Sequence, residues 1–88
     1  MEKSKYTQKE FYLLIKKNLR RLHYASGYSR AYVAEQMDIS FQAYSDMLTL
    51  SLVDRYPSLE TMRRFCLFFQ VDISEFFKPI NENILQMN

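Results

Sequence analysis

A first helix is predicted over residues 8–24, because apolar side chains there recur with the i, i+3, i+4 and i+7 spacing of one helix face. That face consists of Phe11, Leu14, Ile15, Asn18, Leu19 and Leu22. The basic side chains fall on the opposite side, at Lys9, Lys16, Lys17 and Arg20. Gly27 follows, and glycine suits the left-handed residue that closes a helix.

Two short helices are predicted next. Ser29 is a good N-cap for a helix over residues 30–37, whose inward residues are Val33, Ala34 and Met37. Asp38 breaks that helix, and Ser40 is positioned to cap another over residues 41–49. In this third helix Tyr44, Met47 and Leu48 are expected to face inward, with Phe41, Gln42, Ser45 and Asp46 outward.

The last third of the chain predicts two further helices. Pro57 and Ser58 open one over residues 59–70, whose inward stripe is Leu59, Met62, Phe65, Cys66 and Phe69. Asp72 and Glu75 have the spacing of a capping box and predict a short fifth helix that ends at Phe77. The pattern therefore predicts an all-α domain over residues 1–78, followed by a tail at 79–88.

The composition supports helices and excludes several classes of protein. One glycine and two prolines among 88 residues are too few for the turns of a barrel or sandwich. A single cysteine and a single histidine exclude an internal disulfide and a Cys/His zinc site. No phosphate-binding glycine loop and no nucleophile–base pair can be assembled, so we expect no enzyme, no cofactor and no metal. Short apolar runs and the lack of a signal peptide predict a cytoplasmic protein without a membrane partner.

The charge is unevenly distributed. Residues 1–24 carry seven Lys/Arg and two Asp/Glu, whereas residues 25–55 carry two basic and four acidic side chains. A basic segment of this kind either holds phosphates or forms a solvated helix face. The charge distribution alone does not decide between phosphate binding and a solvated helix face.

Two short helices joined by a tight turn describe a helix-turn-helix. The sequence here resembles the Xre/Cro–CI family, whose pattern is Thr/Ser-Gln-x-x-Leu-Ala-x-x-Leu-Gly-Ile-Ser. The matching segment is Ser29-Arg30-Ala31-Tyr32-Val33-Ala34-Glu35-Gln36-Met37-Asp38-Ile39-Ser40. Residues 56–62 and 71–77 resemble the openings of the family's fourth and fifth helices. The resemblance covers residues 11–77 and implies a five-helix, lambda-repressor-like DNA-binding domain with its helix-turn-helix at about 29–49.

The resemblance also implies roles for individual residues. Residues 41–49 become the recognition helix in the major groove of double-stranded DNA, where Gln42 can bond an adenine edge and Phe41 can pack on a thymine methyl. Arg30 takes the place of a phosphate-binding glutamine. Asp38 stands where the family has glycine, and aspartate tolerates a positive φ. The expected DNA contacts are Lys16, Lys17, Arg20, Arg30, Ser40, Phe41, Gln42, Ser45, Asp46 and Arg55.

The function that follows is a sequence-specific transcriptional regulator, a repressor that binds a short palindromic operator as a homodimer. The dimer contact is expected at Phe76, Phe77, Ile80, Ile84 and Leu85. The alternative is a protein-interaction module on the same fold, an antitoxin, anti-repressor or inhibitor of phage or mobile-element origin. In that case Phe41, Asp46 and residues 50–53 face another protein instead of DNA.

Overall fold

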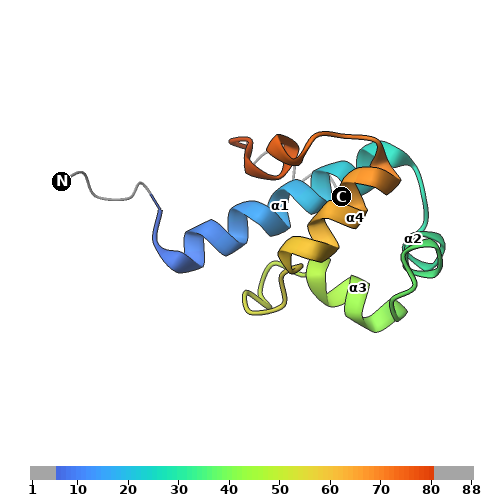
Figure 1. Ribbon diagram of the computed structural model, residues 1–88. Helices are drawn as coiled ribbons and strands as arrows, with labels where there is room; N and C mark the ends of the chain where they lie inside the picture. The colour runs from blue at the N-terminus through green and yellow to red at the C-terminus, as the bar shows by residue number, and fades with distance from the viewer. Residues whose placement is uncertain (1–5, 81–88) are drawn as a thin grey trace.

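A computed structural model of the chain describes residues 6–80. Over that range the chain is all-helical, without a strand, and its elements are α1 (Gln8–Ser26), α2 (Arg30–Met37), α3 (Phe41–Leu48), α4 (Leu59–Phe69) and the 3-10 turn η1 (Ile73–Phe77). Figure 1 shows α1 as the long helix, with η1 packed along it and α2 and α3 toward its C-terminal half. The all-α class is confirmed, whereas the predicted fifth α-helix is a single 3-10 turn.

Serine hydroxyls begin three of the helices. The side chains of Ser29, Ser40 and Ser58 accept hydrogen bonds from the backbone N–H groups of Tyr32, Ala43 and Thr61. Each bond satisfies an N–H that the first helical turn leaves without a partner. The caps predicted at Ser29 and Ser40 are therefore confirmed.

Left-handed residues end three of the helices. Gly27 follows α1 with φ 76°, and Asp38 follows α2 with φ 56°, as both positions were expected to do. Gln70 follows α4 with φ 58°, which the sequence did not indicate. These residues turn the chain sharply, and after Asp38 and Gln70 the next element packs on the helix just left, α3 on α2 and η1 on α4.

The start of η1 corrects one sequence prediction. Asp72 does cap the turn, since its carboxylate accepts from the N–H of Ser74 at 2.9 Å. Glu75, however, does not complete a capping box, because its carboxylate forms ion pairs with Arg21 at 3.1 Å and Lys78 at 2.7 Å. Two cations compete more strongly for a carboxylate than one backbone N–H.

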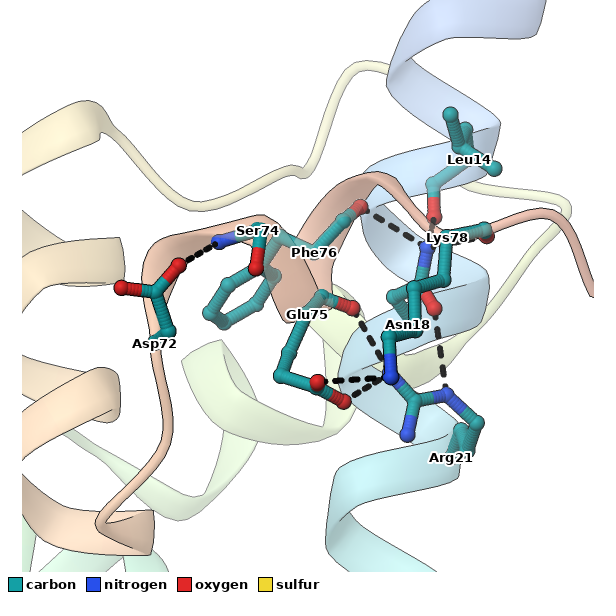
Figure 2. A network of polar contacts seen from close by, with 8 residues as sticks. All are labelled: Leu14, Asn18, Arg21, Asp72, Ser74, Glu75, Phe76 and Lys78. Atoms are coloured by element: carbon teal, nitrogen blue, oxygen red, sulfur yellow. Dashed lines mark hydrogen bonds and ion pairs between the residues drawn. The ribbon is translucent and has the colours of Figure 1, made fainter.

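A buried asparagine joins η1 to α1 (Figure 2). Asn18 is fully buried, and its Nδ2 donates to the carbonyl oxygens of Leu14 at 3.1 Å, Phe76 at 2.8 Å and Lys78 at 2.9 Å. Arg21 extends the network by donating to Oδ1 of Asn18 and to the carbonyl oxygen of Glu75. Asn18 thus occupies its predicted core position as a polar anchor.

The core gathers side chains from all five elements, namely Ile15, Leu19, Leu22, Val33, Ala34, Met37, Tyr44, Leu48, Met62, Phe65 and Phe76. Two residues assigned to inward faces lie outside it. Leu59 is 72% exposed, because it begins α4 before the helix reaches the core, and Phe11 is 41% exposed and stacks on Phe77. Cys66 is half-buried against the core. None of the helices between residues 6 and 80 is long and apolar enough to cross a membrane.

The expected dimer contact also changes. Phe76 is fully buried against Phe65, so it cannot meet a second subunit. Its burial follows from the Asn18 bond to its carbonyl, which draws η1 onto α1. Ile84 and Leu85 lie outside the described residues.

Candidate nucleic-acid interface

Backbone hydrogen bonds hold the turn at residues 38–40, which joins α2 to α3. The N–H of Asp38 donates to the carbonyl oxygen of Glu35 at 3.1 Å, and the N–H of Ile39 donates to that of Ala34 at 3.0 Å. Val33, Ala34 and Met37 of α2 are buried, as are Tyr44 and Leu48 of α3. The two helices therefore share one buried side, which fixes the opposite side toward the outside.

The outward side of α3 carries most of the expected base-contacting residues. Phe41 is 54% exposed, Gln42 is also exposed, and Asp46 is half-buried. Ser45 differs from the prediction, because its hydroxyl oxygen is buried and has no hydrogen-bond partner among residues 6–80. Nε2 of Gln42 donates to Oδ1 of Asp46 at 2.8 Å. Ser40 is exposed at the N-cap, where its hydroxyl is already used by the N–H of Ala43. The structure therefore brings Phe41, Gln42, Ser45 and Asp46 together on one short helix.

Lys16 does not lie on the solvent side of α1, contrary to the sequence prediction. It is fully buried, and its Nζ donates to the carbonyl oxygens of Asp46 at 2.9 Å, Leu52 at 2.6 Å and Arg55 at 2.7 Å. The carbonyl oxygens of Asp46 and Leu52 each accept one backbone N–H and have a second lone pair to offer, which gives an ammonium group a place in the interior. Burial lowers the pKa of Lys16 to about 8, while Asp54 and Asp46 act to raise it. At neutral pH its three N–H groups match the three carbonyls.

Two arginines hold neighbouring helix ends in the same way. Nη1 of Arg20 donates to the carbonyl oxygen of Leu48, the last residue of α3, at 2.9 Å. Arg64 of α4 donates to the carbonyl oxygen of Met37, the last residue of α2. Arg20 also lies 5.3 Å from the ring centre of Tyr24. Lys16 is thus bound in the interior, and Arg20, which is half-buried, has Nη1 engaged at the end of α3, so neither is the solvent-side cation that the sequence suggested.

The remaining expected cations lie in different places. Arg30 is the first residue of α2 and is half-buried, and Arg55 is exposed in the loop after α3. Lys17 lines an open cavity of about 240 Å³ together with Tyr6, Leu13 and Ile80, none of which belongs to α2 or α3. Arg30 and Arg55 therefore remain part of the candidate interface, whereas Lys17 lies outside it.

The helix starts differ in charge. Glu10, Glu60 and Glu75 lie in the first turns of α1, α4 and η1, whereas the first turns of α2 and α3 contain no acidic residue. A helix start carries a partial positive charge, and a helix end carries a partial negative one. In α2 and α3 the positive ends are left without an acidic side chain, while Arg64 and Arg20 bind carbonyls at the negative ends.

A buried histidine supports α3 from behind. Nδ1 of His23 lies 2.8 Å from the hydroxyl of Tyr44, and both residues are almost completely buried. Burial lowers the pKa of His23, and the nearby charges of Arg30 and Arg20 lower it further. Burial also raises the pKa of Tyr44. No local sequence pattern indicates this pair, because its members are 21 positions apart.

Acidification should therefore weaken the fold before the carboxylates titrate. Because the folded-state pKa of His23 lies below 6.5, the unfolded chain binds its proton first, and stability should fall as the pH drops below 6.5. Each unit by which the pKa is lowered corresponds to about 1.4 kcal/mol. Urea unfolding between about pH 7.5 and pH 5 should show this loss in the wild type and a smaller loss in His23→Gln. An equal loss in both proteins would contradict the assignment.

Comparisons of the chain with protein-family models, with curated proteins and with solved structures found no match. The candidate interface is accordingly defined by its geometry: two capped helices, a left-handed turn residue between them, and an outward side on α3.

Proposed function

We propose that the chain is a sequence-specific DNA-binding transcriptional regulator, a repressor of the Xre/Cro–CI type. In this proposal α2 and α3 form the helix-turn-helix, and α3 lies in the major groove. The observation that carries it is the polarity of the two helices. Their N-terminal ends lack acidic side chains, and the half-buried Arg20 and Arg64 bind carbonyls at their C-terminal ends. Such an arrangement favours a phosphate group at the N-terminal end of each helix.

Phosphate binding rests on few side chains in this proposal. Arg30 begins α2 beside its unpaired backbone N–H groups, and Arg55 follows α3 in an exposed loop. Two such cations per subunit give four in a dimer, and each neutralised phosphate contributes about −0.9 to the salt dependence of the logarithm of affinity. We therefore expect a shallow slope of about −4.

Base reading rests on the outward side of α3. The Gln42 amide can bond N6 and N7 of adenine together, and the Phe41 ring can contact a thymine methyl. Asp46 lies one turn further along the same helix. Support from behind comes from Lys16, Arg20 and the His23–Tyr44 pair, which fix the helix so that binding orders little of the protein.

Selection from a randomised duplex pool tests the proposal. The wild type should enrich related, roughly palindromic sequences, and Gln42→Ala should weaken binding to the best of them about 10-fold, since a good bidentate contact is worth ~1–3 kcal/mol. Gln8→Ala is the matched control. Gln8 is also an exposed helical glutamine bonded to a residue four positions on, Tyr12, but it lies on α1.

The same selection at two salt concentrations separates sequence reading from nonspecific attraction. Weak retention of all duplexes that disappears at moderate salt would refute a sequence reader. It would favour the second candidate function, a protein-interaction module. The observation that supports this candidate is the 54% exposure of Phe41 on the outward side of α3, a ring that a protein partner could cover.

The proposed homodimer requires a surface other than the one around Phe76. An apolar surface on α4 and η1 is formed by Leu59, Cys66, Leu67 and Ile73, with a cavity of about 350 Å³ beside Glu60 and Arg63. Leu67 is 68% exposed. Glu60 and Arg63 pair at 2.7 Å within one subunit, so this edge of the surface carries no net charge toward a second copy.

Sedimentation should show a concentration-dependent dimer for the wild type in the micromolar range. Leu67→Glu should sediment as a monomer at the same concentrations, because two carboxylates would be buried in the contact. Leu52→Glu is the control, since Leu52 is 38% exposed on the loop after α3, and it should still dimerise. A wild-type monomer throughout this range would rule out the α4 surface as a dimer contact.

A further inference from the structure

We infer that Asp46 is a positioning residue whose carboxylate holds the amide of Gln42 in the orientation that reads adenine. The inference rests on the proposed DNA-binding function and concerns its sequence preference. Asp46 was expected to contact a base itself. Its bond to Gln42 gives it a different task.

The bond between the two side chains fixes which way the amide faces. Gln42 and Asp46 lie one helical turn apart on the outward side of α3, with 2.8 Å between Nε2 and Oδ1. An ionised carboxylate has only acceptors, so the amide must turn its NH₂ group toward Asp46. The carbonyl oxygen Oε1 of Gln42 is thereby turned away from Asp46, toward the outside.

Half of the amide remains free in this arrangement. An amide nitrogen carries two hydrogens, one beside the carbonyl oxygen and one pointing back along the side chain. A carboxylate on the same helix is within reach of the second hydrogen. The first hydrogen and Oε1 then form an unoccupied edge with one donor and one acceptor. Adenine presents the complementary pair in the major groove, an N7 acceptor and an N6 donor.

Asp46 is itself held in place. Its backbone carbonyl oxygen accepts from the buried Nζ of Lys16 at 2.9 Å, which fixes the backbone from which the carboxylate extends. The contacts thus run from the interior to the surface: Lys16 holds the backbone of Asp46, and the side chain of Asp46 holds the amide of Gln42. Without Asp46 the exposed amide rotates freely and presents either of its groups to the groove.

The test measures discrimination at a single base pair. The starting point is the best duplex selected by the wild type. Dissociation constants are compared between A·T and G·C at the one base pair where Gln42→Ala loses the wild-type preference. The wild type should favour A·T about 10-fold. Asp46→Ala should reduce this ratio to about 2-fold, whereas Asp46→Asn should keep it, because its amide oxygen accepts the same hydrogen bond. Melting temperatures of both variants should stay within about 2 °C of the wild type, since the bond is exposed.

Each result has a definite meaning. A wild type that enriches no sequence overturns the DNA-reading function and this inference together. Enrichment with an A·T preference that Gln42→Ala removes but Asp46→Ala leaves intact overturns the inference alone. So does an equal loss in Asp46→Ala and Asp46→Asn, which would assign the effect to charge. Loss of a cytosine preference at another base pair would make Asp46 a direct reader instead.

Discussion

Replacing Lys16 with methionine should destabilise the protein by about 3 kcal/mol. Methionine fits the space of the lysine stem but takes an ammonium donor from the carbonyl oxygens of Asp46, Leu52 and Arg55. The first two keep one backbone N–H each, from Thr49 and Arg55, so the largest loss falls on the carbonyl of Arg55. Hydrogen bonds to a charged group are worth ~1.5–3 kcal/mol each, and release of the buried ammonium offsets part of the sum. For a domain of this size the melting temperature should fall by about 12–24 °C.

Thermal unfolding followed by circular dichroism measures this change. The control is Lys9→Met on the same helix, where the side chain is exposed, and its melting temperature should stay close to that of the wild type. If Lys16→Met melts with the control, Lys16 does not hold the end of α3. The same variant should also lose specific duplex binding, because the backbone of Asp46 would no longer be fixed.

Replacing Asn18 with leucine should cost about 2–3 kcal/mol. Leucine has nearly the same shape, but it cannot donate to the carbonyl oxygens of Phe76 and Lys78, which lie at and just beyond the end of η1. Because these bonds draw η1 onto α1 (Figure 2), their loss should also loosen the seat of Phe76 in the core.

Asn18→Asp separates the loss of donors from a change of shape. Aspartate is nearly identical in size, but its carboxylate would face three carbonyl oxygens. Urea unfolding at neutral pH should therefore find it at least as unstable as Asn18→Leu. Gln36→Glu, a comparable amide-to-acid change at an exposed position of α2, should be nearly neutral. A wild-type-like Asn18→Asp would show that the Asn18 bonds contribute little.

Local patterns in the sequence were sufficient for the four α-helices and for several of their ends. Serines before apolar periodic segments mark real N-caps at Ser29 and Ser40, and Gly27 and Asp38 have the positive φ expected of them. Each of these features depends on residues only a few positions apart, which is the range that periodicity and capping describe. The outward exposure of Phe41 and Gln42 follows from the same helical phase.

The hydrogen bonds from Lys16 and Arg20 to distant backbone carbonyls could not be predicted from local sequence patterns. Lys16 meets carbonyls 30 to 39 positions away, and Arg20 meets one 28 positions away. A helical wheel places both residues outside the apolar stripe, yet α3 and its loop cover that side of α1. The sequence did hold a hint at Asn18, a polar residue within an apolar stripe, which marks a position where the core needs a hydrogen-bond donor.

The burial of Lys16 has a consequence for measuring motion. An amine-reactive reagent can reach its Nζ only when the loop carrying Leu52 and Arg55 separates from α1, because the side chain is fully buried in the closed state. The modification rate of Lys16, relative to exposed Lys9, therefore measures how often α3 and its loop open. A duplex bound to α3 would lower this rate without contacting the lysine.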